Sequence, residues 1–370
     1  MLDGRDKISI RQAMLILLIM AFTPAVRVIP SFTTLKAMQA GWLCGIVGTI
    51  PFVFVLIMFG YIYRTYKKRS LMEITVDVLG KYLGYIVIVL FFLWVVLLNG
   101  LYLRFYGERL LDSAYPNVDI KTFIIILLIL INIVIRSGLS VIARMNEVII
   151  AIIVIMFISL CILMVPEIGI YKLYPLSQNN VIPVLEGSLG VLAIEGYIII
   201  VLVFSDQINN MEKLIKTGLK TVAFMSVTIT ILLVSTIGTT GCTLASKAPL
   251  PFLLAVKEIS IYGVLDRLEA FVIATWIISD FVLISIFTYC GLKILSFLFH
   301  ISEWKQYINI YIIFIYLFSL YISNEVFELQ ALSDLCFIYV NSFIEVVIPL
   351  VIFLTAIIRK KIRLGKNNVS

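Results

Sequence analysis

The sequence predicts an all-α polytopic membrane protein of about ten transmembrane helices, and three observations carry this prediction. Hydrophobic residues make up 62% of the 370 residues, charged residues make up 14%, and the mean hydropathy is +1.10. A soluble domain carries about 25% charged residues, so this chain would expose too much apolar area in water. The apolar residues gather in runs of the length that crosses a bilayer, about 20 residues each. Lys and Arg residues concentrate in alternate segments between these runs.

Ten apolar runs give the predicted spans. They lie near residues 9–35, 42–63, 83–106, 120–136, 139–165, 185–204, 217–243, 265–290, 307–323 and 336–358. The first run is longer than a signal-peptide core and has no small-residue cleavage site, so we interpret it as a transmembrane helix. With the N-terminus inside, twenty of the 29 Lys and Arg residues fall in cytoplasmic segments and eight in outside segments, while Arg27 lies in a span. The positive-inside rule then predicts that both termini are cytoplasmic.

The order of the connecting segments predicts a repeat of opposite orientation. Spans two and three are joined by a longer amphipathic stretch, Tyr66–Tyr82, on the inside. Spans seven and eight are joined by a similar stretch, Ser246–Gly263, on the outside. A shift by five spans matches the two stretches with inverted orientation, which is typical of a 5+5 inverted-repeat transporter. We therefore predict one transmembrane domain over residues 1–370, with repeats at about 8–166 and about 183–360 and a basic cytoplasmic tail at 361–370.

Span one contains a sequence that is expected to break its helix within the membrane. Pro24, flanked by Thr23 and Ala25, has no amide hydrogen to donate and clashes with the carbonyl four residues back. The freed backbone groups need a ligand, a water or a polar side chain, and the amide end of a broken helix favours a carboxylate. Arg27 lies one turn beyond, where a guanidinium is costly unless it is paired or wet. Three interpretations stay open for it: a clamp on a ligand carboxylate, an ion-pair strut to Glu195, or snorkelling to the outer interface.

Span six is expected to have a break at the matching position. Gly190 and the triplet Glu195-Gly196-Tyr197 lie near its middle. Paired breaks in corresponding spans indicate a binding site at the midplane, although Pro and Gly are also common in membrane helices generally. Four interpretations stay open for Glu195: it accepts a ligand ammonium, exchanges a proton, pairs with Arg27 or has a purely structural role.

Polar residues in three further spans are candidates for the lining of such a site. Asn99 and Tyr102 share one face of span three, and Tyr102 also suits the outer aromatic belt. Ser279 and Asp280, near the middle of span eight, form a patch that would face a ligand or an ion. Glu345 in span ten is interpreted as a structural partner or a proton site.

The remaining features argue for structure and against catalysis. Arg144 and Glu147, at (i, i+3) at the inner end of span five, predict a local stabilising salt bridge. No nucleophile motif, P-loop, GxGxxG or HExxH is present, and the five cysteines form no CxxC. We predict no enzyme activity, no cofactor and no metal site. The net charge of +7 is interpreted as cytoplasmic anchoring in a lipid bilayer and not as a nucleic-acid surface.

Several short motifs carry a family resemblance. Residues 136–144 read RSGLSVIAR and are followed by Glu147. Together they resemble the pattern R-x-G-L-E-x-I-A-R with a trailing Glu of the B subunits of spore germinant receptors, with Ser140 in place of the usual Glu. This family is related to amino-acid permeases of the APC superfamily. Further similar segments are Ile259-Ser260-Ile261, Asp266–Ala270 with Trp276 at the start of span eight, Gly41-Trp42, and Leu79–Gly84.

The resemblance implies a LeuT-like fold that binds a small germinant, often an amino acid, between broken spans one and six. It also implies assembly with an A subunit and a lipoprotein C subunit in the inner membrane of a dormant spore, where binding signals the release of ions and small molecules. Thr23 and Ala25 stand where many relatives carry the glycines of a Gly-x-Gly break. The residues alone also fit an autonomous proton-coupled transporter, or a conduit or scaffold whose pocket binds nothing.

Overall fold

The computed structural model describes residues 6–66, 68–113, 117–259, 268–323 and 325–359. The predicted tail at 361–370, the end of the outer connector, and Asp266 and Arg267 of the span-eight motif lie outside these ranges.

The described chain is almost entirely helical. The first half forms α1 (Ile10–Ala37), α2 (Cys44–Val47), α3 (Thr49–Thr65), α4 (Leu71–Leu79), α5 (Lys81–Ser113), α6 (Ile120–Ser137) and α7 (Leu139–Met164). The second half forms α8 (Val181–Glu195), α9 (Ile198–Val203), α10 (Leu214–Thr240), α11 (Cys242–Lys247), α12 (Pro251–Lys257), α13 (Glu269–Leu298), α14 (Ile308–Tyr321), α15 (Val326–Leu335) and α16 (Ile348–Ile358). Two π-helical segments, Cys336–Val340 and Phe343–Val347, join α15 to α16.

Local chemistry explains where the long helices begin and change direction. Ser9 and Gln12 form a capping box at the start of α1, in which the Ser9 hydroxyl accepts from the Gln12 amide at 3.2 Å. Gly138 separates α6 from α7 with a φ of 94°, and Gly80 separates α4 from α5 with a φ of 90°. A side chain is strained at such angles, so glycine permits these two sharp junctions.

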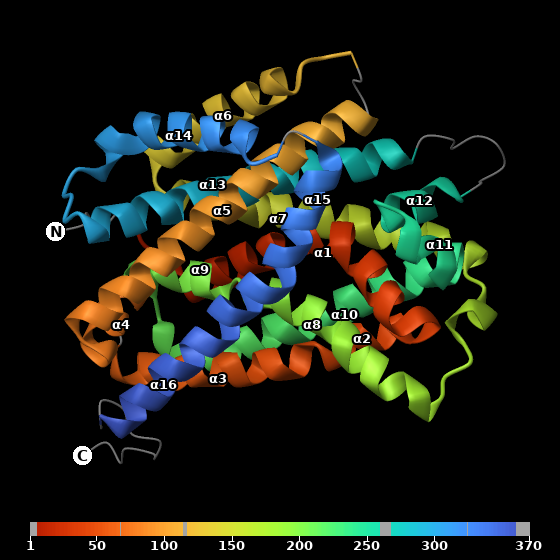
Figure 1. The fold of residues 1–370 in the computed structure, drawn as a ribbon, viewed down its shortest axis with the longest axis horizontal. Coiled ribbons are helices and arrows are strands. Elements are labelled where there is room, and N and C mark those ends of the chain that lie inside the picture. The colour runs from red at the N-terminus through yellow and green to blue at the C-terminus, as the bar shows by residue number, and fades with distance from the viewer. Residues whose placement is uncertain (1–5, 67, 114–116, 260–267, 324, 360–370) are drawn as a thin grey trace.

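Within the described ranges, eight helical segments are long and apolar enough to cross a membrane. The first of them, Ile10–Thr65, contains both α1 and α3, which run in opposite directions in Figure 1. The helix α14, with 14 residues, is shorter than these segments but fills the predicted ninth span. Each of the ten predicted spans therefore corresponds to helix in the described chain.

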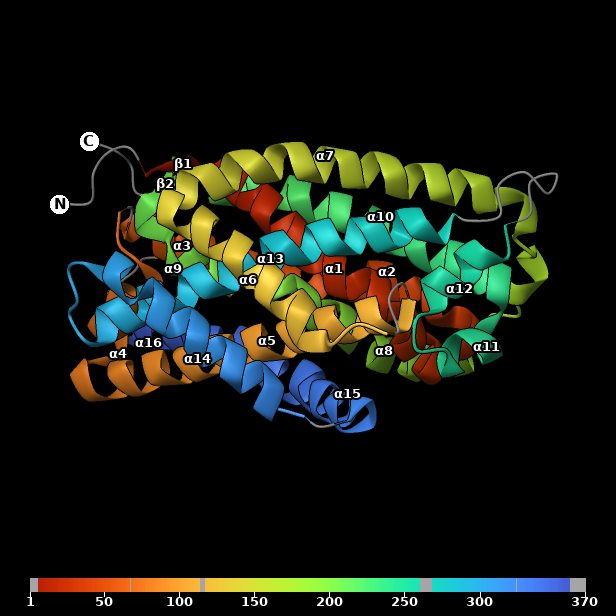
Figure 2. The same ribbon diagram turned by 90° about the horizontal axis from the view of Figure 1, so that it is seen from above.

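The connecting helices lie at opposite ends of the bundle. In both views α4 and the end of α16 lie at the end where β1 (Ile8–Ser9) pairs with β2 (Ile208–Asn209), and α11 and α12 lie at the other end (Figures 1 and 2). The two connectors thus lie at opposite ends of the bundle, as predicted, and the assignment of one end to the cytoplasm stays a prediction. The division into repeats at 8–166 and 183–360 stays a prediction.

The centre of the bundle is built from spans one and six. All six residues of α9 are buried, and most of α1 is buried against α8 and α10. Span six is interrupted as predicted: α8 ends at Glu195, α9 begins at Ile198, and Gly196 and Tyr197 form a turn between them.

The predicted break in span one is wrong, because α1 is continuous over 28 residues with Pro24 and Pro30 inside it. Hydroxyl groups bond carbonyls of the same helix close to the two prolines. Thr23 donates to the Ile19 carbonyl at 3.2 Å, and Thr33 donates to the Ile29 carbonyl at 2.8 Å. Pro24 and Pro30 leave the Met20 and Val26 carbonyls, four residues back, without their helical donors. The hydroxyl bonds fall on other carbonyls close to these positions, and membrane helices tolerate proline without unwinding.

A test of this packing uses Gly48, where α2 meets α8. A Cβ atom there would lie 2.6 Å from Val191 Cβ and 2.7 Å from the Ser188 carbonyl oxygen. Gly48→Ala is expected to lower the free energy of unfolding by about 1–3 kcal/mol through overpacking. Unfolding of the purified protein in detergent measures this. Gly169→Ala is the control, since the neighbouring atoms there belong to the exposed Tyr171 ring, and an equal loss in both variants would contradict the account.

Candidate functional site at the helix break

The break in span six is held by residues of span ten. In a continuous helix the Ala193 carbonyl would accept from the amide of Tyr197, but that amide bonds the Ile194 carbonyl instead, at 3.4 Å. The side-chain amide of Asn341 donates to the Ala193 carbonyl at 3.2 Å. Trp94 of α5 in turn donates to Asn341 Oδ1 at 2.8 Å. The freed carbonyl is therefore satisfied from within the protein, as a membrane interior requires.

Glu345 lies against the same break. Its carboxyl group is fully buried, and neither of its oxygens has a hydrogen-bond partner among the described residues. A Cβ atom at Gly196 would lie 2.5 Å from Glu345 Cδ, so only glycine allows this approach. Glu345 lies in the second π-helical segment, one turn beyond Asn341. Such wide turns recur at functional sites, where they re-aim side chains.

Aromatic side chains from spans three and eight pack against Tyr197. Its hydroxyl and that of Tyr102 lie 2.8 Å apart in a hydrogen bond. Phe287 of α13 stacks on Tyr102 with ring centroids 5.5 Å apart and meets Tyr197 edge-on at 5.9 Å. Tyr102 is 4% exposed, which argues against a position in the outer aromatic belt, and its predicted role in ligand binding stays a prediction.

Arg27 reaches this aromatic group from α1. Its guanidinium carbon lies 3.9 Å from the Phe105 ring centroid and 5.3 Å from that of Tyr102. Arg27 is 7% exposed, and its Nη1 has no hydrogen-bond partner among the described residues. Stacking of this kind stabilises a desolvated cation by about 2 kcal/mol. The burial of Arg27 argues against snorkelling to the interface.

Arg27 and Glu195 do not pair in the described structure, where no ion pair within 4.0 Å joins them. Glu195 lies toward α3, and its Oε1 accepts from the Thr49 hydroxyl at 3.2 Å. Its Oε2 has no hydrogen-bond partner among the residues described. The strut interpretation of Arg27 is therefore wrong for this conformation.

A small cavity lies between Arg27 and the break. Its volume is about 10 Å³, at the limit of the room for one water molecule. The structure is consequently closed around this site. The cavity is lined by Arg27, Leu98, Leu101, Tyr102, Phe105, Tyr197, Ser333, Cys336, Phe337 and Asn341.

Asp280 is engaged by a residue that sequence reasoning had placed outside the membrane. Its carboxylate forms a buried ion pair with Arg109, which also lies 5.8 Å from the Trp276 ring centroid. The predicted third span ended at residue 106, whereas α5 continues to Ser113 and carries Arg109 into the bundle. Two signals in the sequence could have indicated this pair: the helical pattern that continues past residue 106, and the acid Asp280 in another predicted span.

Four other candidates lie apart from the cavity. Asn99 donates to Thr288 Oγ1 at 3.0 Å, and Ser279 donates to the Trp276 carbonyl at 3.1 Å. Gly190 packs against the Phe32 ring, where a Cβ atom would lie 2.5 Å from Phe32 Cδ1. Ala25 faces α7 and α10 on another side of α1.

The predicted salt bridge between Arg144 and Glu147 is wrong. The exposed Arg144 donates from Nε to the Ser140 carbonyl at 3.2 Å, within its own helix. Glu147 instead accepts from Gln12 Nε2 at 3.3 Å, which links α7 to the first turn of α1. Each side chain therefore has another hydrogen-bond partner, and the (i, i+3) spacing alone does not bring them together.

Solved structures show what class of fold this is. The chain is similar to MhsT in complex with L-phenylalanine, with a TM-score of 0.65 and 12% identity over 95% of this chain and 99% of that one. It is also similar to Mhp1, a nucleobase-cation-symport-1 family transporter, with a TM-score of 0.69 and 12% identity over 97% of this chain and 80% of that one. A Na⁺-coupled sialic acid symporter matches with a TM-score of 0.63 and 13% identity over 91% of this chain and 80% of that one. The protein has the LeuT-type transporter fold, which confirms the predicted fold class.

The sequence comparisons give the family within that class. The Spore_permease family, described as spore germination protein, matches residues 7–326, so the chain belongs to this family. It is 24% identical to spore germination protein KB of Bacillus subtilis (strain 168) over 364 residues, 97% of each chain. It is also 24% identical to spore germination protein YndE of the same organism over 288 residues, 76% of this chain and 78% of that one. These matches confirm the resemblance drawn from the motifs.

The ion pair of Arg109 and Asp280 yields a second prediction. Asp280→Leu alone is expected to lower the free energy of unfolding by about 3–5 kcal/mol, because it leaves a buried guanidinium without its carboxylate. The double variant Arg109→Met with Asp280→Leu is expected to recover most of that loss. Denaturation of the single and double variants in detergent forms a double-mutant cycle. Additive losses would show that the pair does not contribute as a unit.

Proposed function

We propose that this chain is the membrane subunit of a spore germinant receptor, which binds a small germinant beside the span-six break and thereby triggers germination. The observation that carries the proposal is Arg27, a buried cation with a free Nη1 at the wall of a central cavity. A guanidinium in a membrane interior without a carboxylate partner is costly, and a ligand carboxylate would offset this cost.

An amino acid fits the charges near the cavity. Arg27 would bind the carboxylate, and the break brings Glu195 and Glu345 close to the same region as acceptors for the ammonium. The hydroxyl groups of Tyr102 and Tyr197 would contribute hydrogen bonds to the ligand. Thr23, Pro24 and Gly196 would shape the backbone of spans one and six beside it. The complex of MhsT with L-phenylalanine supports this choice, since that protein shares the fold.

Binding would require the cavity to widen. A volume of about 10 Å³ does not hold an amino acid, so the described conformation is a closed one. Phe337 lines the cavity, and its ring centroid lies 6.2 Å from that of Phe32 on α1. We propose that α15 and the π-helical segments move away from α1 to admit the ligand, and that this motion carries the signal.

Family membership supports the proposed setting of the protein. The chain would lie in the inner membrane of the spore with both termini in the cytoplasm, as its Lys and Arg distribution predicts. Its proposed partners are a germinant receptor A subunit and a lipoprotein C subunit. The fold and family are those of permeases, and we propose no enzymatic role.

An autonomous proton-coupled transporter is the second candidate, because Glu195 and Glu345 are buried carboxyl groups with oxygens that have no partner in the described structure. A second feature that fits a transporter is a cavity of about 410 Å³ at the end of the bundle that carries β1. Its lining includes Lys293 and Asp206, which form an ion pair with Nζ and Oδ1 2.8 Å apart. Sustained amino-acid counterflow in proteoliposomes of the chain alone would favour this transporter over the receptor. A conduit or scaffold without a ligand is the third candidate.

The third prediction tests the ligand site. Among amino acids, sugars and nucleosides screened against the purified protein, an amino acid is expected to stabilise it by about 2.7 kcal/mol at 100 times the dissociation constant. Arg27→Ala is expected to abolish this stabilisation. Thermal unfolding in detergent measures both effects, with the exposed Arg144→Ala as the control. A stabilising ligand that is unaffected by Arg27→Ala would contradict the site.

A further inference from the structure

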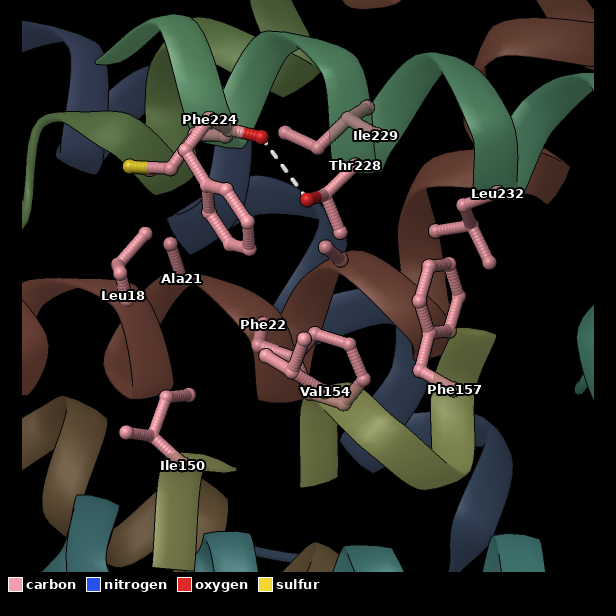
Figure 3. A pocket seen from close by; sticks show the side chains of 12 residues that line it. Leu18, Ala21, Phe22, Ile150, Val154, Phe157, Phe224, Thr228, Ile229 and Leu232 are labelled. Atoms are coloured by element: carbon pink, nitrogen blue, oxygen red, sulfur yellow. Dashed lines mark hydrogen bonds between the residues drawn. The ribbon is translucent and has the colours of Figure 1, made fainter. Parts of the chain in front are cut away.

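A second, apolar cavity lies on another side of α1. Figure 3 shows α1, α7 and α10 around a slot whose volume is about 30 Å³. Its floor is Ala21 and Ala25 of α1, which are one turn apart and therefore share a face. Other lining residues are Leu18, Phe22, Ile150, Val154, Phe157, Phe224, Met225, Thr228, Ile229 and Leu232.

The residues that line the slot offer too few polar groups to hold a water molecule. Thr228 carries the one side-chain hydroxyl in its lining, and that hydroxyl already donates to the Phe224 carbonyl at 2.8 Å. A buried water needs two to four polar partners, and apolar cavities of this kind stay dry and take up hydrocarbon instead.

The mouth of the slot opens on the lipid-facing side of the bundle. Figure 2 shows α7 along one edge of the molecule with α10 beside it. Next to the slot, α7 exposes 65% of Ile155, and α10 exposes 58% of Val227 and 42% of Phe224. These apolar side chains face the hydrocarbon of the bilayer, so the molecules that surround the mouth are lipid acyl chains.

The slot also lies behind the proposed ligand site. Arg27 follows Ala25 by two residues, which turns it by about 200° around the helix axis. An occupant of the slot would therefore press on the side of α1 that faces away from the Arg27 cavity.

We infer that this slot takes up the end of one acyl chain of a membrane lipid, which packs against Ala21 and Ala25 and supports α1 from the lipid side. A volume of about 30 Å³ has room for the last few carbon atoms of an alkyl chain, and the apolar lining fits such an occupant.

Photo-crosslinking tests the inference on the full chain without any substitution. The protein is reconstituted in vesicles of phosphatidylglycerol that carries a diazirine within one acyl chain, irradiated, and mapped by mass spectrometry. We expect adducts on Ala21 or Ala25, although these residues are only 2% and 3% exposed. The wholly buried helix α9 gives the background level. Labelling of Ala21 and Ala25 no higher than this background would overturn the inference.

A matched pair of variants identifies the slot as the point of access. Thr228→Leu places a larger apolar side chain in the slot and is expected to abolish the adducts. Val227→Leu, on the adjacent lipid-facing position, is expected to leave them in place. Adducts that persist in Thr228→Leu would contradict the assignment. Adducts of the unaltered chain that vanish as the protein-to-lipid ratio rises would show that a second copy occupies the slot, and would likewise overturn it.

Discussion

The structure depends on how the backbone groups at a helix break find hydrogen-bond partners where water is absent. An interruption between Glu195 and Ile198 frees backbone groups in the middle of the bundle, and each unsatisfied group there costs several kcal/mol. Asn341 bonds the Ala193 carbonyl, and Trp94 holds Asn341 in turn. Spans three, six and ten are therefore tied together at one point. Asn341 lies between the two π-helical segments of span ten and Glu345 lies in the second, so this irregular stretch packs against the break.

Three ionisable side chains around the break and the cavity have no ion-pair partner within 4.0 Å in the described chain. Arg27, Glu195 and Glu345 each also have at least one buried polar atom without a hydrogen-bond partner there. By contrast, Arg109 and Asp280 form a buried ion pair. Groups that are costly and unsatisfied in a closed state are those that a ligand or a proton can stabilise, so the break and Arg27 together define the proposed site.

The sequence predicted the architecture well, because length, apolarity and charge asymmetry are properties of whole segments. All ten spans and the break at Gly196-Tyr197 follow from such patterns. The continuous α1 was not predicted, since the pattern does not reveal that Thr23 and Thr33 bond carbonyls near the prolines. Arg109 was missed because the end of an apolar run is not the end of its helix. Pairings between distant spans, such as Asn341 with Ala193, depend on packing that no local pattern encodes.

The central claim is that a ligand carboxylate replaces the missing partner of Arg27. A structure of the protein with the proposed germinant bound tests this most directly. The account predicts an enlarged cavity in which the carboxylate lies within hydrogen-bonding distance of the Arg27 guanidinium, beside Tyr102 and Tyr197. A germinant bound elsewhere, with Arg27 still stacked on Phe105 and the cavity unchanged, would contradict it.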